Sequence, residues 1–209
     1  MPRLLVIDTE TSGTDPALHS ILSFACLVWE NGSEGNSLSF LVREASKVVA
    51  DPEAMKINGI DLSDIQAKGC TPRAAVDSID TFCAQNFPES RRGDKVVLAG
   101  HNICFDVAFL RRLYAVAGRN FDAIFSHRMI DTASIVRFLG LAGFLDLPEP
   151  SSDSAFRHFG IAPDRNSRHT ALGDARATHA LLNHLIGLLC NRGGQMANRN
   201  YDPVAQNPK

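Results

Sequence analysis

Apolar residues form three dense segments near the start of the chain, separated by short polar stretches. Residues 3–9, 20–30 and 36–43 have the length and the β-branched or aromatic content of strands, and the second is apolar almost throughout. A turn-rich stretch at 30–35 joins the last two segments. This pattern predicts an antiparallel array of three strands.

Helical spacing of apolar residues begins after this array. A short proline-led helix is predicted at 52–58, a second after Asp61, and a longer one that begins with a Thr71 cap and Pro72. The later predicted elements are a strand at 95–99, a helix at 104–117, a strand and a helix within 125–142, and a helix at 170–189. Alternating strands and helices predict an α/β fold, a mixed sheet with helices on both faces.

The last predicted helix has the clearest periodicity. Its apolar stripe, with steps of three and four residues, is Leu172, Ala175, His179, Leu182, Ile186 and Leu189. Beyond residue 190 this periodicity disappears. We therefore predict one domain over residues 1–190 and a flexible tail over 191–209.

Two carboxylates interrupt the apolar first strand. Because alternate side chains of a strand point to the same face, Asp8 and Glu10 lie side by side while Thr9 faces away. Asp106 and Asp174 follow in helical segments, where each alone has a structural alternative as a helix-start aspartate. Four carboxylates gathered by folding repel one another unless a cation separates them. Such hard oxygen ligands suit Mg²⁺ or Mn²⁺, which predicts a site for two divalent ions.

His169 precedes Asp174 by five residues. On one ideal helix this spacing would separate the two side chains by about 140° around the axis. Both can face one site only if His169 lies in the loop that enters the helix and Asp174 in its first turn. A histidine there suits a general base, because its pKa lies naturally near working pH.

Three ordered motifs resemble those of one enzyme family. Asp8-x-Glu10, Asn102-x-x-x-Asp106 and His169-x4-Asp174 are similar to the motifs of the DnaQ-like (DEDDh) 3′-to-5′ exonucleases of the ribonuclease-H-like superfamily. The resemblance covers roughly residues 3–189. It implies a ribonuclease-H-like mixed sheet, with three antiparallel strands followed by parallel ones.

The same resemblance implies a reaction. Single-stranded 3′ ends, with DNA slightly favoured over RNA, would be hydrolysed to nucleoside 5′-monophosphates by a two-metal-ion mechanism with His169 as general base. The predicted catalytic residues are His169, Asp8, Glu10, Asp106 and Asp174, and the last four are the predicted metal ligands.

The resemblance also implies substrate contacts near these motifs. The predicted contacts are Thr11, Ser12, Gly13, Asn58, Asn102 and Phe105. Phe105 could stack on a base, although a core pair with Phe109 at i, i+4 explains it equally well. A simple turn after the first strand is the alternative for residues 11–13. Asn58 stands where family members often have a histidine.

Composition indicates how the protein meets its substrate and in which compartment it is located. The 209-residue chain is 44% hydrophobic and 21% charged with a net charge of -2, so it lacks the basic surplus of a generic nucleic-acid binder. Its five cysteines are odd in number and form no CxxC pair, which predicts reduced thiols in the cytoplasm. No apolar run approaches the ~20 residues of a membrane span, so no membrane partner is predicted.

Alternatives to this exonuclease prediction stay open at this level. The chain could be a catalytically inactive nucleic-acid-binding or polymerase-associated scaffold of the same fold, or a phosphatase or endonuclease of that broad fold. The presence of all five motif residues favours an active enzyme, and the His-x4-Asp ending favours an exonuclease. A DNA polymerase or a repair protein is a possible partner.

Overall fold

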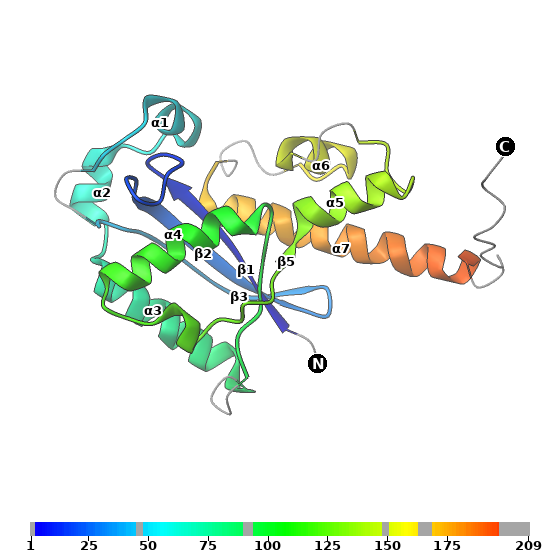
Figure 1. The fold of residues 1–209 in the computed structure, drawn as a ribbon, viewed down its shortest axis with the longest axis horizontal. Helices are drawn as coiled ribbons and strands as arrows, with labels where there is room; N and C mark the ends of the chain where they lie inside the picture. Colours follow the sequence, from blue (N-terminus) through cyan, green and yellow to red (C-terminus); the bar gives the residue numbers. More distant parts are fainter. Residues whose placement is uncertain (1–2, 45–47, 90–93, 148–150, 163–168, 197–209) are drawn as a thin grey trace, which may run out of the picture.

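A five-stranded mixed sheet forms the centre of the molecule (Figure 1). The computed structural model describes residues 3–44, 48–89, 94–147, 151–162 and 169–196. The strand order is β3-β2-β1-β4-β5, where β1 (Arg3–Thr11), β2 (Ile21–Glu30) and β3 (Ser33–Leu41) are antiparallel. β4 (Leu98–Gly100) and β5 (Ile130–Asp131) continue the sheet parallel to β1. The predicted fold class is confirmed.

Seven α-helices lie within the described residues, most of them near their predicted positions. Their bounds are α1 Pro52–Asn58, α2 Leu62–Lys68, α3 Pro72–Asn86, α4 Ile103–Val116, α5 Thr132–Leu141, α6 Ser152–His158 and α7 Ala171–Met196. A short 3₁₀ turn, η2, spans Phe121–Ala123. Local caps explain several starts: the Asp51 side chain accepts from Glu53 N–H, and the Thr71 hydroxyl accepts from Ala74 N–H.

The two faces of β1 contact different helices. Leu5 and Ile7 belong to the large core formed with α3 and α4, whereas Val6 packs with Ala175 and Leu182 of α7. Helices α5 and α6 pack against α7 through a separate apolar cluster. Side chains at even positions of β1 therefore face α7, and those at odd positions face α4.

Some predicted boundaries are wrong. β3 begins three residues earlier than predicted, and β4 is shorter because Val96 makes only an isolated bridge to Phe125. Helix α6 was not predicted. Helix α7 continues seven residues past the predicted end at 189, so the first six residues of the predicted tail, 191–196, are helical. Once nucleated by packing, a helix can extend by backbone hydrogen bonds alone, which an apolar pattern does not reveal.

Two predictions lie outside the described residues: the loop at 163–168 ahead of His169 and the tail beyond Met196. Among the helices that the structure describes, none is both long enough and apolar enough to cross a membrane.

Candidate active site

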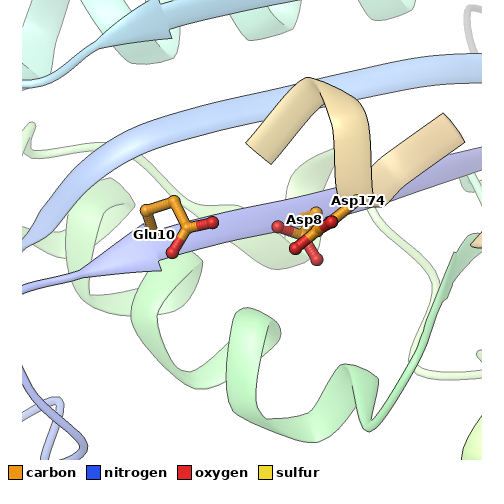
Figure 2. A group of neighbouring side chains, drawn as sticks. All are labelled: Asp8, Glu10 and Asp174. Atoms are coloured by element: carbon orange, nitrogen blue, oxygen red, sulfur yellow. The ribbon is translucent and has the colours of Figure 1, made fainter. Parts of the chain in front are cut away.

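Three carboxylates from two distant segments converge at the carboxyl end of β1. Asp174, from the first turn of α7, lies beside Asp8, and the carboxylate of Glu10 points along the strand toward both (Figure 2). One carboxylate oxygen from each of the three residues lies within 4.8 Å of the others. Asp174 is only 9% exposed. The sequence separation between Glu10 and Asp174 is bridged because α7 packs along the face of β1 that bears both strand carboxylates.

The local geometry at the start of α7 places Asp174 at this point. Thr170 lies just before the helix; its carbonyl accepts from Asp174 N–H at 2.9 Å and its hydroxyl from Gly173 N–H at 3.2 Å. Asp174 is therefore in the first turn, as predicted. His169 lies outside the helix with a left-handed backbone (φ 60°), which also agrees with the predicted loop position.

The chemistry of this donor set fits a divalent cation. Three carboxylates at such short range repel one another, and part of that repulsion is relieved only by protonation or by a positive ion. Oxygen-only ligand sets are those preferred by Mg²⁺ and Mn²⁺. Asp8, Glu10 and Asp174 are thus suited to hold a divalent ion.

Asp106, the fourth predicted ligand, lies apart from this cluster. It extends from α4 to Thr9 of β1, where its Oδ1 accepts from Thr9 N–H at 2.9 Å and from the Thr9 hydroxyl at 2.7 Å. The side chain is 5% exposed, and burial raises its pKa to about 7 although both Thr9 hydrogen bonds oppose the rise. Both bonds use Oδ1, so Oδ2 is the oxygen that could bind an ion.

The predicted substrate residues after β1 stabilise their own loop. The Thr11 hydroxyl donates to the Gly13 carbonyl at 2.7 Å, and the Ser12 hydroxyl donates to the Val49 carbonyl at 2.7 Å. Ser12 is fully buried and its backbone N–H donates to the Ser20 carbonyl. Side chains at 11 and 12 thus have structural hydrogen bonds; a substrate role for this segment stays a prediction.

Gly13 and Asn58 also have structural tasks here. A Cβ on Gly13 would lie 2.4 Å from the His19 ring, so only glycine permits this close packing. The Asn58 amide donates to the Thr11 carbonyl at 3.0 Å and its oxygen accepts from Ile60 N–H at 3.0 Å. Asn58 therefore ties the end of α1 to the loop beside Glu10.

Asn102 and Phe105 flank Asp106 at the start of α4. Asn102 is exposed, has a left-handed backbone (φ 58°), and makes no capping hydrogen bond with its side chain. The Phe105 ring contacts Phe109 with centroids 4.9 Å apart and packs against the main core. The core-pair alternative for Phe105 is thus present in the structure, and base stacking stays a prediction.

Sequence reasoning missed two long-range contacts of α4, one of which lies at the site. Thr9 was expected only to face away from Asp8 and Glu10, yet it binds Asp106. Glu44 is also buried, with a 2% exposed side chain that accepts from Arg112 of α4 at 3.0 Å and from Ile21 N–H at 3.2 Å. The residues in contact are far apart in sequence, 97 residues for Thr9 and Asp106 and 68 residues for Glu44 and Arg112. No local sequence pattern could therefore reveal these contacts.

The sheet has the topology of the ribonuclease-H-like α/β fold, with the acidic cluster at the carboxyl end of its first strand. A sequence model of the family RNase_T, described as "Exonuclease", matches residues 5–182, and the chain belongs to this DnaQ-like exonuclease family.

Two curated relatives show that proteins similar to this chain have different names. The chain is 26% identical over 198 residues to a protein named Ribonuclease T from Blochmanniella pennsylvanica, covering 91% of this chain and 87% of that one. It is 31% identical over 194 residues to a "DNA polymerase III subunit epsilon-like protein" from Rhodobacter capsulatus, covering 90% of this chain and 24% of that one.

Solved structures of E. coli Exonuclease I share the fold. The complex with a dT13 oligonucleotide superposes with a TM-score of 0.77 at 20% identity, covering 96% of this chain. A zinc-bound complex with single-stranded DNA gives a TM-score of 0.74 at 21% identity, also over 96% of this chain. The chain spans 44% and 46% of the length of those two Exonuclease I chains.

Proposed function

We propose that the protein is a metal-dependent exonuclease that releases nucleoside 5′-monophosphates from the 3′ end of a single strand. The observation that supports this most strongly is the convergence of Asp8, Glu10 and Asp174 within 4.8 Å in a chain of the exonuclease family. Exonuclease I, which has the same fold, is known in complexes with a dT13 oligonucleotide and with single-stranded DNA. That likeness supports the choice of a single strand as substrate.

The proposed chemistry assigns a task to each motif residue. Asp8, Glu10 and Asp174, together with Oδ2 of Asp106, would hold two divalent ions, which when bound neutralise charge on the scissile phosphate and activate water. His169 would accept a proton from the attacking water as its oxygen forms a bond to phosphorus. The bond from phosphorus to the 3′-oxygen of the preceding nucleotide breaks, and that oxygen takes up a proton from solvent water.

The left-handed backbone of His169 supports this assignment. Histidine is among the few residue types that adopt this conformation with any frequency, and such outliers concentrate at functional sites. Because His169 lies outside α7, its imidazole can approach the cluster from a different direction than Asp174. The ion ligands are then all carboxylates, which leaves the histidine to handle the proton.

Three more detailed proposals concern the polymer that is cut, the location of the protein in the cell, and its partner. We favour DNA slightly over RNA, because one relative is named as an epsilon-like subunit of DNA polymerase III and Exonuclease I binds single-stranded DNA. Ribonuclease T among the relatives makes RNA the competing substrate. A cytoplasmic location and a polymerase or repair partner stay predictions.

One experiment tests the function. Purified protein is incubated with matched DNA and RNA single strands that have a 5′ label, in Mg²⁺, in Mn²⁺ and in EDTA. We expect a metal-dependent ladder that shortens from the 3′ end, and the faster ladder identifies the polymer. Asp8→Asn should abolish the ladder, whereas Asp94→Asn, a change at an exposed aspartate ahead of β4, should not. If neither polymer shortens in either metal, the inactive scaffold becomes the better interpretation.

A further inference from the structure

A polar cavity of about 500 Å³ lies beside the start of α4. Its lining comes from three separated segments: the start of α4, the first two turns of α5, and the start of α6. The lining residues used below are Asn102, Asp131, Ser134, Arg137 and Ser151. None of them belongs to the acidic cluster, yet Asn102 immediately precedes the helix whose first turn contains Asp106. The cavity therefore lies beside the Asp106 end of the candidate active site and shares only Asn102 with its predicted residues.

The acid in this cavity is already surrounded by donors. Oδ1 of Asp131 accepts from Asn102 N–H at 2.8 Å and from Ala133 N–H at 3.1 Å, and Oδ2 accepts from the Ser134 hydroxyl at 2.6 Å. Three hydrogen bonds spread the negative charge of this carboxylate over neighbouring donors. Asp131 thus orders the starts of α4 and α5, and its two oxygens are already used as acceptors for donors of the protein.

Arg137, the positively charged residue of this cavity, is not engaged in the way that Asp131 is. Arg137 is exposed and, within the part of the chain that the structure describes, its guanidinium has no hydrogen bond or ion pair. Most other described arginines are already paired with carboxylates: Arg3, Arg73, Arg111, Arg112, Arg119 and Arg176. In a chain of net charge -2, an uncommitted arginine in a cavity next to the metal ligands favours an anionic ligand there.

A neighbouring amide matches the same ligand. The Asn102 side chain makes no capping hydrogen bond, whereas the Ser151 hydroxyl already donates to Ser154 Oγ at 2.9 Å. An arginine together with an amide donor is a combination that binds phosphate oxygens.

Resting on the proposed function, we propose that this cavity binds a backbone phosphate of the single-stranded substrate on the 5′ side of the scissile bond, with Arg137 as its charged contact. The 3′-terminal nucleotide is the one released, so any phosphate held away from the acidic cluster belongs to the retained strand. The site would then position the strand for each successive cut.

The test compares two substrates that differ only in having this phosphate. One is a labelled single strand on the order of ten nucleotides long; the other is the p-nitrophenyl ester of thymidine 5′-monophosphate, which has no upstream nucleotide. Arg137→Gln should lower kcat/KM on the strand about tenfold, mainly through KM, and leave the ester unchanged. The matched control is Arg128→Gln, a change at an exposed arginine that does not line the cavity, and it should alter neither substrate.

Salt dependence identifies the contact as a phosphate. Loss of one such contact should reduce the slope of log KM against log salt by roughly 0.7 for a single strand, and Arg137→Lys should restore most of it. Equal losses on strand and ester, or no loss on either, would overturn the proposal. So would weaker inhibition by inorganic phosphate with an unchanged strand KM, since the cavity would then take free phosphate.

Failure of the proposed function gives a different result. If the wild-type protein hydrolyses neither substrate, fluorescence anisotropy of the labelled strand in Mg²⁺ replaces the kinetic assay. Weaker binding by Arg137→Gln than by Arg128→Gln would support the cavity as a strand site in a binding protein. Equal binding by the two variants would overturn it.

Discussion

The two faces of β1 place carboxylates in opposite circumstances within three residues of sequence. On the α7 face, Asp8 and Glu10 meet Asp174, so carboxylate faces carboxylate. On the α4 face, Asp106 meets the N–H and hydroxyl of Thr9, so its Oδ1 has two hydrogen-bond donors. One face gathers three negative charges at a point suited to a cation, and on the other face two donors from Thr9 stabilise a single carboxylate.

The two faces therefore contribute differently to metal binding: one determines the affinity for the ion, and the other fixes the position of a ligand. Repulsion within a cluster of like charges destabilises the metal-free fold. A divalent ion relieves this repulsion, which makes its binding more favourable. A buried carboxylate with local donors holds its position with or without an ion. Asp106 can therefore present Oδ2 at a fixed point while the α7 face supplies most of the attraction for metal.

Removing one member of the cluster should have the largest effect. Asp8→Asn should reduce kcat by at least on the order of 10³-fold, because the remaining oxygens hold the ions poorly. It should also raise the melting temperature in EDTA, since it relieves repulsion, and diminish the stabilisation by Mg²⁺. Differential scanning fluorimetry with and without Mg²⁺ checks both shifts against Asp94→Asn. An unchanged response to Mg²⁺ would contradict the assignment of Asp8 as a ligand.

His169→Ala should have the second largest effect. As a general base it should contribute about 10²-fold to kcat, while the stabilisation by Mg²⁺ stays at the wild-type level because no cluster oxygen is lost. His127→Ala, at an exposed histidine, is the control. A collapse of the Mg²⁺ response in His169→Ala would reassign the histidine to the metal ligands.

The sequence allowed prediction of the α7 face better than of the α4 face. Strand alternation alone places Asp8 and Glu10 on one side, and the five-residue spacing excludes His169 and Asp174 from one helical face. Both arguments depend on local backbone geometry, and the structure has the same arrangement. The bond from Thr9 to Asp106 spans 97 residues and depends on how α4 packs, which no local pattern specifies.

The same limit explains the other differences. Short helix α6 has only seven residues and few apolar positions, so its formation depends on packing against α5 and α7. Residue types at 11–13 and 58 are equally compatible with binding a substrate and with tying a loop together. Only the contacts to Val49, His19 and Thr11 reveal the structural part of their role.

A substitution on the α4 face of β1 should lower kcat less than the two substitutions above. Thr9→Val keeps the shape of the side chain but removes its hydroxyl donor from Asp106, so it should destabilise the fold by about 1–3 kcal/mol and lower kcat roughly tenfold. The loss of that bond should also raise the pKa of Asp106 further. Denaturant unfolding and single-turnover rates measure the two effects. Thr81→Val, at an exposed position of α3, controls for loss of a threonine hydroxyl, and equal behaviour of the two variants would contradict the role of Thr9.

The last expected effect is a pH dependence of stability, not of turnover, that belongs to Asp106. Burial raises the pKa of this carboxyl from 3.8 to about 7, so between these values the metal-free folded state binds a proton that the unfolded state has released. Its contribution to stability is therefore complete below about pH 4 and is lost as pH rises to 7. Mg²⁺ needs the ionised carboxylate, so its stabilising effect should increase over the same interval and level off above pH 7. Asp106→Asn should flatten the Asp106 part of both profiles in thermal unfolding measured with EDTA and with Mg²⁺. Identical profiles for this variant and the wild type would place the titration in the Asp8, Glu10 and Asp174 cluster instead.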